Sequence, residues 1–249
     1  MSGPDRIRLR IRFSKLGKIR WTSHRDVARM WERAFRRVQL PLAYSEGFSP
    51  RPRVSFGLAL PTGYESVAEF LDVELTSLDG IELDALAGRL SAALPIGVDA
   101  TAIARLPQGA SSLQEEVALC SWRWTAVPAV DAPAGVEEIV ERVPAVMAAD
   151  ALEIARHRKG VEVVEDIRPG LLSLQVESVT AEGAVLTADL AAVPRAVRPT
   201  DVMIAIGPGF EERQVRRTHQ WIMRHGAHQE PLAAARDEAP APHAMERAS

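Results

Sequence analysis

Residues 6–13 read RIRLRIRF, in which basic and apolar side chains alternate without interruption. Alternation with a period of two places successive side chains on opposite faces of a β-strand, a pattern that no helix can bury on one side. The segment is therefore predicted to be a strand whose aliphatic and aromatic face lies in a core. The opposite face, open to water, would carry Arg6, Arg8, Arg10 and Arg12.

A helix is predicted after this strand and a short loop. Ser23 is a suitable N-cap, and Asp26 three residues later gives an acidic form of the capping box. Apolar residues then recur at helical spacing until Pro41, which ends the pattern. The buried stripe would consist of Val27, Met30, Trp31, Ala34, Phe35 and Val38.

The elements that follow complete the order β-α-β-β-α-β, which is typical of a ferredoxin-like unit with antiparallel strands and both helices on one face. They are predicted as strands at 53–60 and 66–75, a helix at 82–93 and a strand at 97–105.

The second half of the chain, after the linker PQGASSLQ, has a similar but longer pattern. Its elements are predicted as strands at 116–127, 151–157, 161–167, 171–179 and 184–190, with helices at 134–148 and 200–206. The prediction is an α+β protein made of tandem ferredoxin-like units, the second one decorated. The domains would be residues 1–108, 109–210 and 211–249, the last a helix at 211–224 followed by a disordered tail.

Positive charge is concentrated in the first part of the chain. Residues 1–60 contain 14 Lys and Arg against 4 Asp and Glu, a net of +10, whereas residues 61–249 contain 16 against 29, a net of −13. The two values sum to the −3 of the whole chain. This split favours a polyanionic partner for one face of the protein.

Cysteine content and hydropathy restrict the classes of protein to which the chain can belong. Cys120 is the single cysteine, which excludes an internal disulfide and a cysteine-ligated iron–sulfur cluster within this chain. No apolar run approaches the roughly 20 residues that a membrane-spanning helix needs, and the N-terminus lacks the apolar region of a secretory signal. We therefore expect a cytoplasmic protein without a membrane partner.

Arginines recur on the predicted first helix, opposite its apolar stripe. A ridge of this kind can follow the phosphates of a nucleic acid, although a solvated helix face has the same pattern. Lysines and arginines in the neighbouring loops favour an anion site. The candidate contacts are Lys15, Lys18, Arg20, Arg25, Arg29, Arg33, Arg36 and Arg37.

The segment YSEGFSPRPR, residues 44–53, combines aromatic and cationic side chains on a backbone that glycine and proline restrict. Tyr44 and Phe48 supply aromatic faces, and Arg51 and Arg53 supply planar donors. This combination suits single-stranded nucleic acid or a nucleotide-like ligand. The alternative is a rigid loop whose aromatic rings complete the core.

His24 follows the predicted N-cap, where the helix disfavours the charged imidazolium, so a neutral general base is reasonable there. The alternatives are that His24 and Asp26 order the start of the helix or that they contact the ligand. Motifs of phosphate-binding loops, zinc peptidases and serine hydrolases are absent.

The same N-terminal block resembles a known family. Its segments GKIRWTSHRD, LPLAYSEGFSPRP and SFGLALPTGYES are similar to those of the radical-SAM-linked proteins of uncharacterised function, densely so across residues 6–75. VVEDIRP and VRPTDVM fit the second half of that family. The resemblance implies a radical-SAM partner, and it implies that any iron–sulfur cluster, SAM or cobalamin belongs to that partner, with no cofactor or metal in this chain.

Three hypotheses follow. The first is a non-catalytic module that binds RNA or another polyanion for the radical-SAM partner. The second is a metal-independent endoribonuclease with His24 as its base, since the architecture also resembles the CRISPR-repeat-processing endoribonucleases. The third is a protein–protein adaptor without nucleic acid. The first requires that guanidinium groups of the opening strand, the first helix and the Pro-rich segment converge in one cationic pocket.

Overall fold

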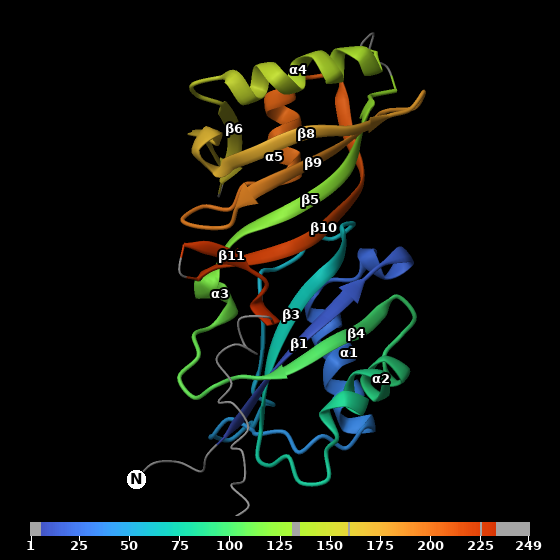
Figure 1. The fold of residues 1–249 in the computed structure, drawn as a ribbon, viewed down its shortest axis with the longest axis vertical. Coiled ribbons are helices and arrows are strands. Elements are labelled where there is room, and N and C mark those ends of the chain that lie inside the picture. The colour runs from blue at the N-terminus through green and yellow to red at the C-terminus, as the bar shows by residue number, and fades with distance from the viewer. Residues whose placement is uncertain (1–5, 131–134, 159, 225, 233–249) are drawn as a thin grey trace, which may run out of the picture.

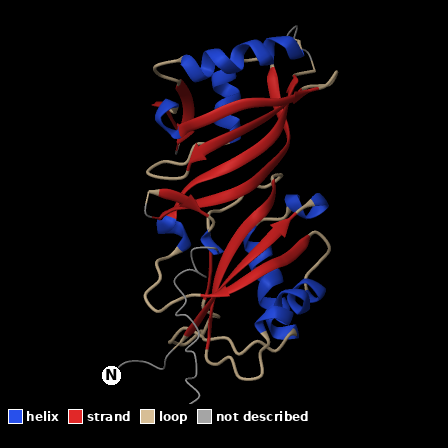
Figure 2. Cartoon of the chain, in the orientation of Figure 1, coloured by secondary structure: helices blue, strands red, loops and turns tan. Residues whose placement is uncertain are grey.

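A mixed sheet of nine strands runs through the described part of the chain, with helices packed against it (Figure 1). The computed structural model describes residues 6–130, 135–158, 160–224 and 226–232. The protein is α+β, as predicted. Figure 2 shows helices packed beside the strands in both halves of the molecule, with shorter helices near its middle.

The first half has the predicted order β-α-β-β-α-β. β1 lies between β4 and β3, β2 pairs with β3, and all of these pairs are antiparallel. The strand predicted at 53–60 is only three residues long. The elements are β1 (Ile7–Lys15), the 3-10 helix η1 (Gly17–Trp21), α1 (His24–Arg37), β2 (Val54–Phe56), β3 (Glu65–Leu75), α2 (Leu83–Ala93) and β4 (Val98–Arg105).

The second half continues the same sheet in the order β10-β5-β9-β8, while β6 and β7 form a separate hairpin. With that hairpin set aside, the strand order repeats that of the first half, which is compatible with tandem ferredoxin-like units. The elements are α3 (Leu113–Glu116), β5 (Val117–Pro128), α4 (Val136–Ala148), β6 (Glu153–Arg158), β7 (Val161–Asp166), η2 (Arg168–Gly170), β8 (Leu171–Val179), β9 (Ala184–Ala191), α5 (Pro199–Ile206), β10 (Phe210–Arg224) and β11 (Ala227–Gln229).

The helix predicted at 211–224 is wrong, because this segment is the strand β10. Its pairing with β5 shifts register between Arg213 and Arg216, between Arg217 and His219, and between Trp221 and Ile222. Each shift changes which face the following side chains occupy, so the sequence lacks the two-residue period of a regular strand.

The disordered tail predicted from about Gly226 is also wrong for residues 226–232. β11 pairs with β10, and the side chain of Leu232 is buried in a small cluster with Leu113 and Phe70. Residues 233–249, which the same prediction covers, lie outside the described residues.

Of the four arginines predicted to lie on the open face of the first strand, Arg10 is buried and the other three are only partly exposed, contrary to the prediction. Arg10 is 2% exposed, and its Nε and Nη2 donate to the two oxygens of Asp72 at 2.8 and 3.0 Å. The other three also meet carboxylates: Arg6 with Glu74, Arg8 with Asp72 and Arg12 with Glu230. The reason is that α3 and residues 226–232 contribute groups to this face, since Arg10 also contacts Glu116 and the Pro231 carbonyl.

The core of the first half fixes the orientation of α1. Val27, Trp31, Ala34 and Phe35 are buried, and Trp31 packs edge-on against Phe13 of β1 with 5.1 Å between ring centroids. Each large apolar side chain buried in this way stabilises the fold by about 1.5–3 kcal/mol. Because this stripe faces the sheet, the arginines on the opposite side of α1 face solvent.

The two halves meet where β3 and β10 run parallel, Glu65 opposite Arg216 and Ser66 opposite Arg217. Buried ionic groups connect the two strands. Arg217 is 2% exposed and donates to Glu69 from Nε at 3.0 Å and from Nη2 at 2.6 Å. Its Nη2 also donates to the Leu58 carbonyl at 2.8 Å. The buried guanidinium of Arg217 thus joins the two halves. A second ion pair joins them closer to solvent, between the half-exposed Arg216 and Glu65 at 2.6 Å.

Candidate functional site

The start of α1 is fixed by the predicted capping residues. The backbone N–H of Asp26 donates to the Ser23 hydroxyl at 3.2 Å, and that hydroxyl donates to the Asp26 carboxylate at 2.8 Å. Ser23 is the N-cap, as predicted. This end of the helix is therefore well defined, and it determines where the arginines along the exposed side of α1 begin.

The Pro-rich segment folds back on itself beside α1. The Ser45 N–H donates to the Arg51 carbonyl at 2.9 Å, and the Arg51 N–H donates to the Ser45 hydroxyl at 3.0 Å. Tyr44 and Pro52 form a bridge, and the Ala43 N–H donates to the Glu74 carbonyl of β3 at 2.8 Å. Gly47 at the tip has φ +116°, a conformation that L side chains rarely adopt. The two sides of the segment are thus held at fixed positions.

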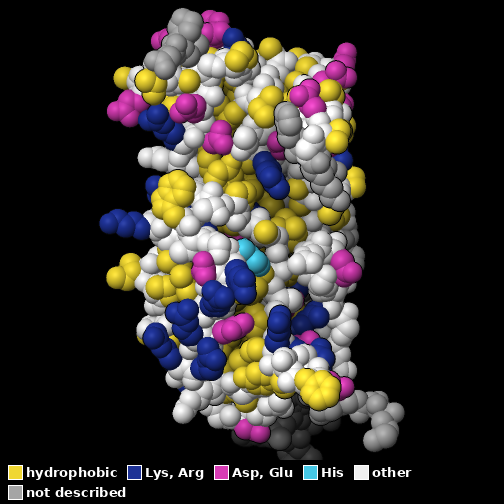
Figure 3. All heavy atoms as spheres, turned by 180° about the vertical axis from the view of Figure 1, so that it is seen from behind, with side chains coloured by type: hydrophobic (Ala, Val, Ile, Leu, Met, Phe, Trp, Pro, Cys, Tyr) yellow, Lys and Arg dark blue, Asp and Glu magenta, His cyan; other side chains and the backbone are white. Residues whose placement is uncertain are grey.

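Between α1 and this segment lies a hollow of about 490 Å³, which we call the basic groove. Three of the predicted helix arginines and two predicted loop residues line it together. Glu32 is the acidic residue in the lining of the groove, and the carboxylate of Asp26 lies 3.4 Å from the guanidinium of Arg29. Figure 3 shows Lys and Arg side chains gathered over this half of the molecule. The groove is lined by Arg25, Ala28, Arg29, Glu32, Arg36, Leu42, Tyr44, Pro50, Arg51 and Pro52.

The other predicted contacts on α1 and in the segment lie outside the groove. Arg33 is exposed on α1, and Arg37 donates to the Ala93 carbonyl of α2 at 3.0 Å. Phe48 is fully exposed, and Arg53 lies 3.7 Å from the Glu74 carboxylate. Lys18 is exposed on η1.

Lys15 and His24 border a different hollow, of only about 20 Å³, together with Glu69. Lys15 is buried, and its Nζ donates to the Arg20 and Thr22 carbonyls, each at 3.1 Å. Burial lowers the pKa of Lys15, an effect that Glu69 partly opposes. Lys15 therefore orders the backbone of η1. The hollow itself is too small for a nucleotide, and His24 is exposed at its border.

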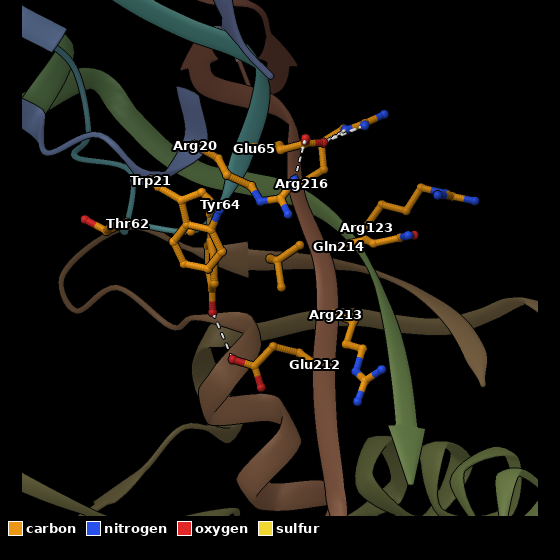
Figure 4. Close-up of a pocket in the computed structure, with 12 residues that line it drawn as sticks. Arg20, Trp21, Thr62, Tyr64, Glu65, Arg123, Glu212, Arg213, Gln214 and Arg216 are labelled. Carbon is orange, nitrogen blue, oxygen red and sulfur yellow. Dashed lines mark hydrogen bonds and ion pairs between the residues drawn. The ribbon is translucent and has the colours of Figure 1, made fainter. Parts of the chain in front are cut away.

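A larger hollow of about 610 Å³, the junction pocket, lies where the two halves meet (Figure 4). It is lined by residues 20–21, 62–65, 123 and 212–216. Of the predicted site residues only Arg20 is here, 3.5 Å from the Glu65 carboxylate. Sequence reasoning missed the others because four distant segments contribute them. The available signals were the pair Arg20–Trp21 and the charged run EERQVRR of β10.

Two titratable groups of the junction pocket have shifted pKa values. Burial would raise the pKa of Glu65, but hydrogen bonds from Arg216 and the Gly17 N–H, with the charges of Arg216 and Arg20, lower it overall. Burial raises the pKa of Tyr64 to about 12. Its hydroxyl contacts the Thr200 hydroxyl at 2.7 Å and donates to Glu212 at 3.2 Å. Glu65 thus connects the two halves as an ionised carboxylate, and Tyr64 connects them as a neutral hydroxyl.

Cys120 is a free cysteine with a buried side chain. Burial raises the pKa of Cys120, so this thiol is not an activated nucleophile. Within the described ranges, no group of three or more His, Cys, Asp or Glu side chains could hold a metal ion. None of the helices in that part of the chain is both long and apolar enough to cross a membrane.

Comparison with known proteins identifies a family for this chain. The profile of a family described as "Uncharacterized protein conserved in bacteria (DUF2344)" matches residues 8–207. No curated protein matches the chain.

Solved structures that resemble the chain do so weakly. A chain of a Cbf5–Nop10–Gar1 complex is 13% identical with a TM-score of 0.45, covering 85% of this chain and 48% of that one. A chain of an H/ACA RNP bound to a substrate RNA containing 2′-deoxyuridine is 14% identical with a TM-score of 0.41, covering 88% and 47%. An unknown protein from Galdieria sulphuraria is 13% identical with a TM-score of 0.24, covering 86% and 99%. The chain thus spans about half the length of the first two, and similarities at this level carry no argument about function.

Proposed function

The chain belongs to the family of uncharacterised proteins conserved in bacteria (DUF2344), and we propose that it is an RNA-binding module whose basic groove holds the phosphate backbone. The observation that carries this proposal is the convergence of four guanidinium groups on one groove, those of Arg25, Arg29, Arg36 and Arg51. Guanidinium groups suit phosphate because they offer planar pairs of N–H donors.

The shape of the groove supports an extended ligand. Arg25 and Arg36 are 11 residues apart on α1, which at 1.5 Å per residue corresponds to roughly 16 Å along the helix. That distance exceeds a single phosphate and suits several successive ones. Tyr44 is 46% exposed and lines the same groove, so it provides a stacking surface for an unpaired base. We therefore propose single-stranded RNA rather than a small anion.

The experiment measures binding of a short unstructured RNA at several salt concentrations. Arg25→Gln combined with Arg51→Gln removes one cation from each wall of the groove. Each lost phosphate contact reduces the slope of log K against log salt by about 0.7, so the double variant should flatten it by about 1.4. Arg33→Gln, on the exposed surface of the same helix but outside the groove, is the matched control and should leave the slope nearly unchanged. Equal slopes for the wild type and the double variant would refute the proposal.

We also propose that the RNA is presented to a radical-SAM enzyme, which would carry the iron–sulfur cluster and any cobalamin. The support for this partner is the sequence resemblance of residues 6–75. Co-elution of the purified chain with a radical-SAM protein from the same genome, with and without nuclease, tests it. Co-elution that persists after nuclease treatment, from a chain that binds no RNA, would instead favour the protein–protein adaptor.

The proposal places the chain in the cytoplasm, where RNA and radical-SAM enzymes occur together. It assigns no cofactor to the chain itself. The second statement is tested by the composition of the native complex after purification, since a cluster or corrinoid that stays with this chain after separation from the partner would contradict it.

A further inference from the structure

The junction pocket is separate from the basic groove and contains a different kind of surface. Residues from η1, the start of β3, β5 and β10 surround it, and its volume of about 610 Å³ is within the range of about 300–1,000 Å³ that is typical of small-molecule sites. In Figure 4, Trp21 and Tyr64 lie on one side of β10, and the side chains of Arg123, Arg213 and Gln214 extend on its other side.

Trp21 is exposed and yet held in place. Its side chain is 65% exposed, and the guanidinium of Arg20 lies 5.4 Å from the ring centroid. The Gly63 N–H donates to the Arg20 carbonyl at 2.8 Å. Gly63 has φ +90°, and a Cβ there would lie 2.9 Å from Cζ3 of Trp21. A large aromatic face that is fixed against the backbone and open to water suits stacking with a planar ligand.

The opposite wall is formed by an irregularity of β10. Gln214 has φ +51°, and the register with β5 breaks between Arg213 and Arg216. Bulges of this kind commonly redirect side chains at binding sites. Here the bulge brings both Arg213 and Gln214 to the lining of the pocket. A guanidinium, which only donates hydrogen bonds, and an amide, which can both donate and accept them, thus line the same pocket as the aromatic ring of Trp21.

The arginines of the pocket differ in how firmly they are already paired. Arg216 is held by Glu65 at 2.6 Å, so it belongs to the connection between the halves. Arg213 lies 3.8 Å from Glu211, and both side chains are more than half exposed. Arg123 pairs with Glu177 at 2.6 Å in an exposed position. Exposed pairs of this type exchange readily for a phosphate, because water already screens the carboxylate.

We propose that the junction pocket binds a nucleotide, with the base stacked on Trp21 and the phosphate on Arg213 and Arg123. The amide of Gln214 would contact the polar edge of the base. This inference does not depend on the basic groove, since the pocket would bind a free nucleotide even if the chain bound no RNA there. The nucleotide can be a free one or one unit of an RNA strand, because the two present the same chemistry.

The experiment titrates the full chain with AMP, and with adenosine as the ligand without a phosphate, by calorimetry. Trp21→Leu should weaken AMP binding by at least 5-fold, which is the lower end of the effect of one stacked base. Arg213→Gln should weaken binding of AMP but not of adenosine. The matched controls are Phe48→Leu, an exposed aromatic residue elsewhere, and Arg105→Gln, an exposed arginine on β4, and both should bind like the wild type.

Two results would overturn the proposal. One is the lack of saturable AMP binding at millimolar concentration by a wild-type chain with an intact circular dichroism spectrum. The other is binding that survives both Trp21→Leu and Arg213→Gln. Competition by a short RNA, repeated in the Arg25→Gln, Arg51→Gln double variant, identifies the source of the nucleotide. Competition that persists in the double variant assigns the pocket to a unit of RNA, and lack of competition assigns it to the free nucleotide.

Discussion

The buried pair of Arg217 and Glu69 should determine how firmly the two halves are joined. Leaving one partner of a buried ion pair uncompensated costs about 3–5 kcal/mol, a large part of the roughly 5–15 kcal/mol that stabilises a typical protein. Glu69→Leu should therefore destabilise the protein by about 3–5 kcal/mol. Arg217→Met should cost less, about 2–4 kcal/mol, because a lone carboxyl can take up a proton whereas a lone guanidinium cannot lose one.

The double variant should lose less than the sum of the two single ones. With both charges gone, apolar groups of similar size occupy the site, a replacement that is often close to neutral. We expect a loss of about 0–2 kcal/mol, and hence a coupling energy of at least about 3 kcal/mol between the two residues. Urea unfolding followed by circular dichroism measures each free energy, and equal m-values confirm that the variants unfold from comparable states.

A matched pair within the same chain tests the contribution of burial. Arg123 and Glu177 also approach to 2.6 Å, but their side chains are 46% and 45% exposed. The same double-mutant cycle on them should give about 0.2–1 kcal/mol. The shortest distance and the residue types are the same, and the pairs differ in burial and in the second N–H that Arg217 donates to Glu69. A coupling energy of the Arg217–Glu69 pair no larger than that of the exposed pair would refute the reasoning.

Three further predictions concern single residues. Glu65→Gln should reduce the loss of Tm on acidification: the lowered pKa of Glu65 means that its stabilisation is present above the ordinary value of 4.5 and disappears as pH falls through the folded-state pKa. A Tm–pH profile as steep as that of the wild type would contradict this. His24→Ala should leave RNA equally intact on a gel, and cleavage by the wild type alone would revive the endoribonuclease. Leu232→Ala should cost about 2–5 kcal/mol by urea unfolding, against under about 0.5 for exposed Leu172→Ala.

The elements that sequence reasoning predicted correctly are those whose signals are local. Strict alternation gave β1, and the Ser23 cap with the apolar stripe gave α1. β10 was wrongly predicted as a helix because its bulges interrupt the alternation that identifies a strand. Bulges depend on how a neighbouring strand pairs with the segment, so no inspection of the segment itself would have revealed them.

The main feature that could not be predicted from the sequence was which carboxylates pair with which arginines. Arg10 meets Asp72, which is 62 residues away, and Glu116, which is 106 residues away. The groove was predictable because α1 and the segment at 44–53 are neighbours in sequence. The junction pocket was not, since residues as distant as Trp21 and Arg213 line it.

The charge split of the sequence therefore overstates the cationic surface that is available to RNA. Of the cations in residues 1–60, those on β1 are paired with carboxylates, and Lys15 is buried. Arg20 and Arg53 also lie beside carboxylates. The groove retains four arginines, so a single-stranded RNA held there should show a salt slope of about −3, four contacts at about 0.7 each. A slope near −10 would require about 14 phosphate contacts at the same 0.7 each, that is, all 14 basic residues of this part of the chain, which the pairing of Arg10 with Asp72 does not allow.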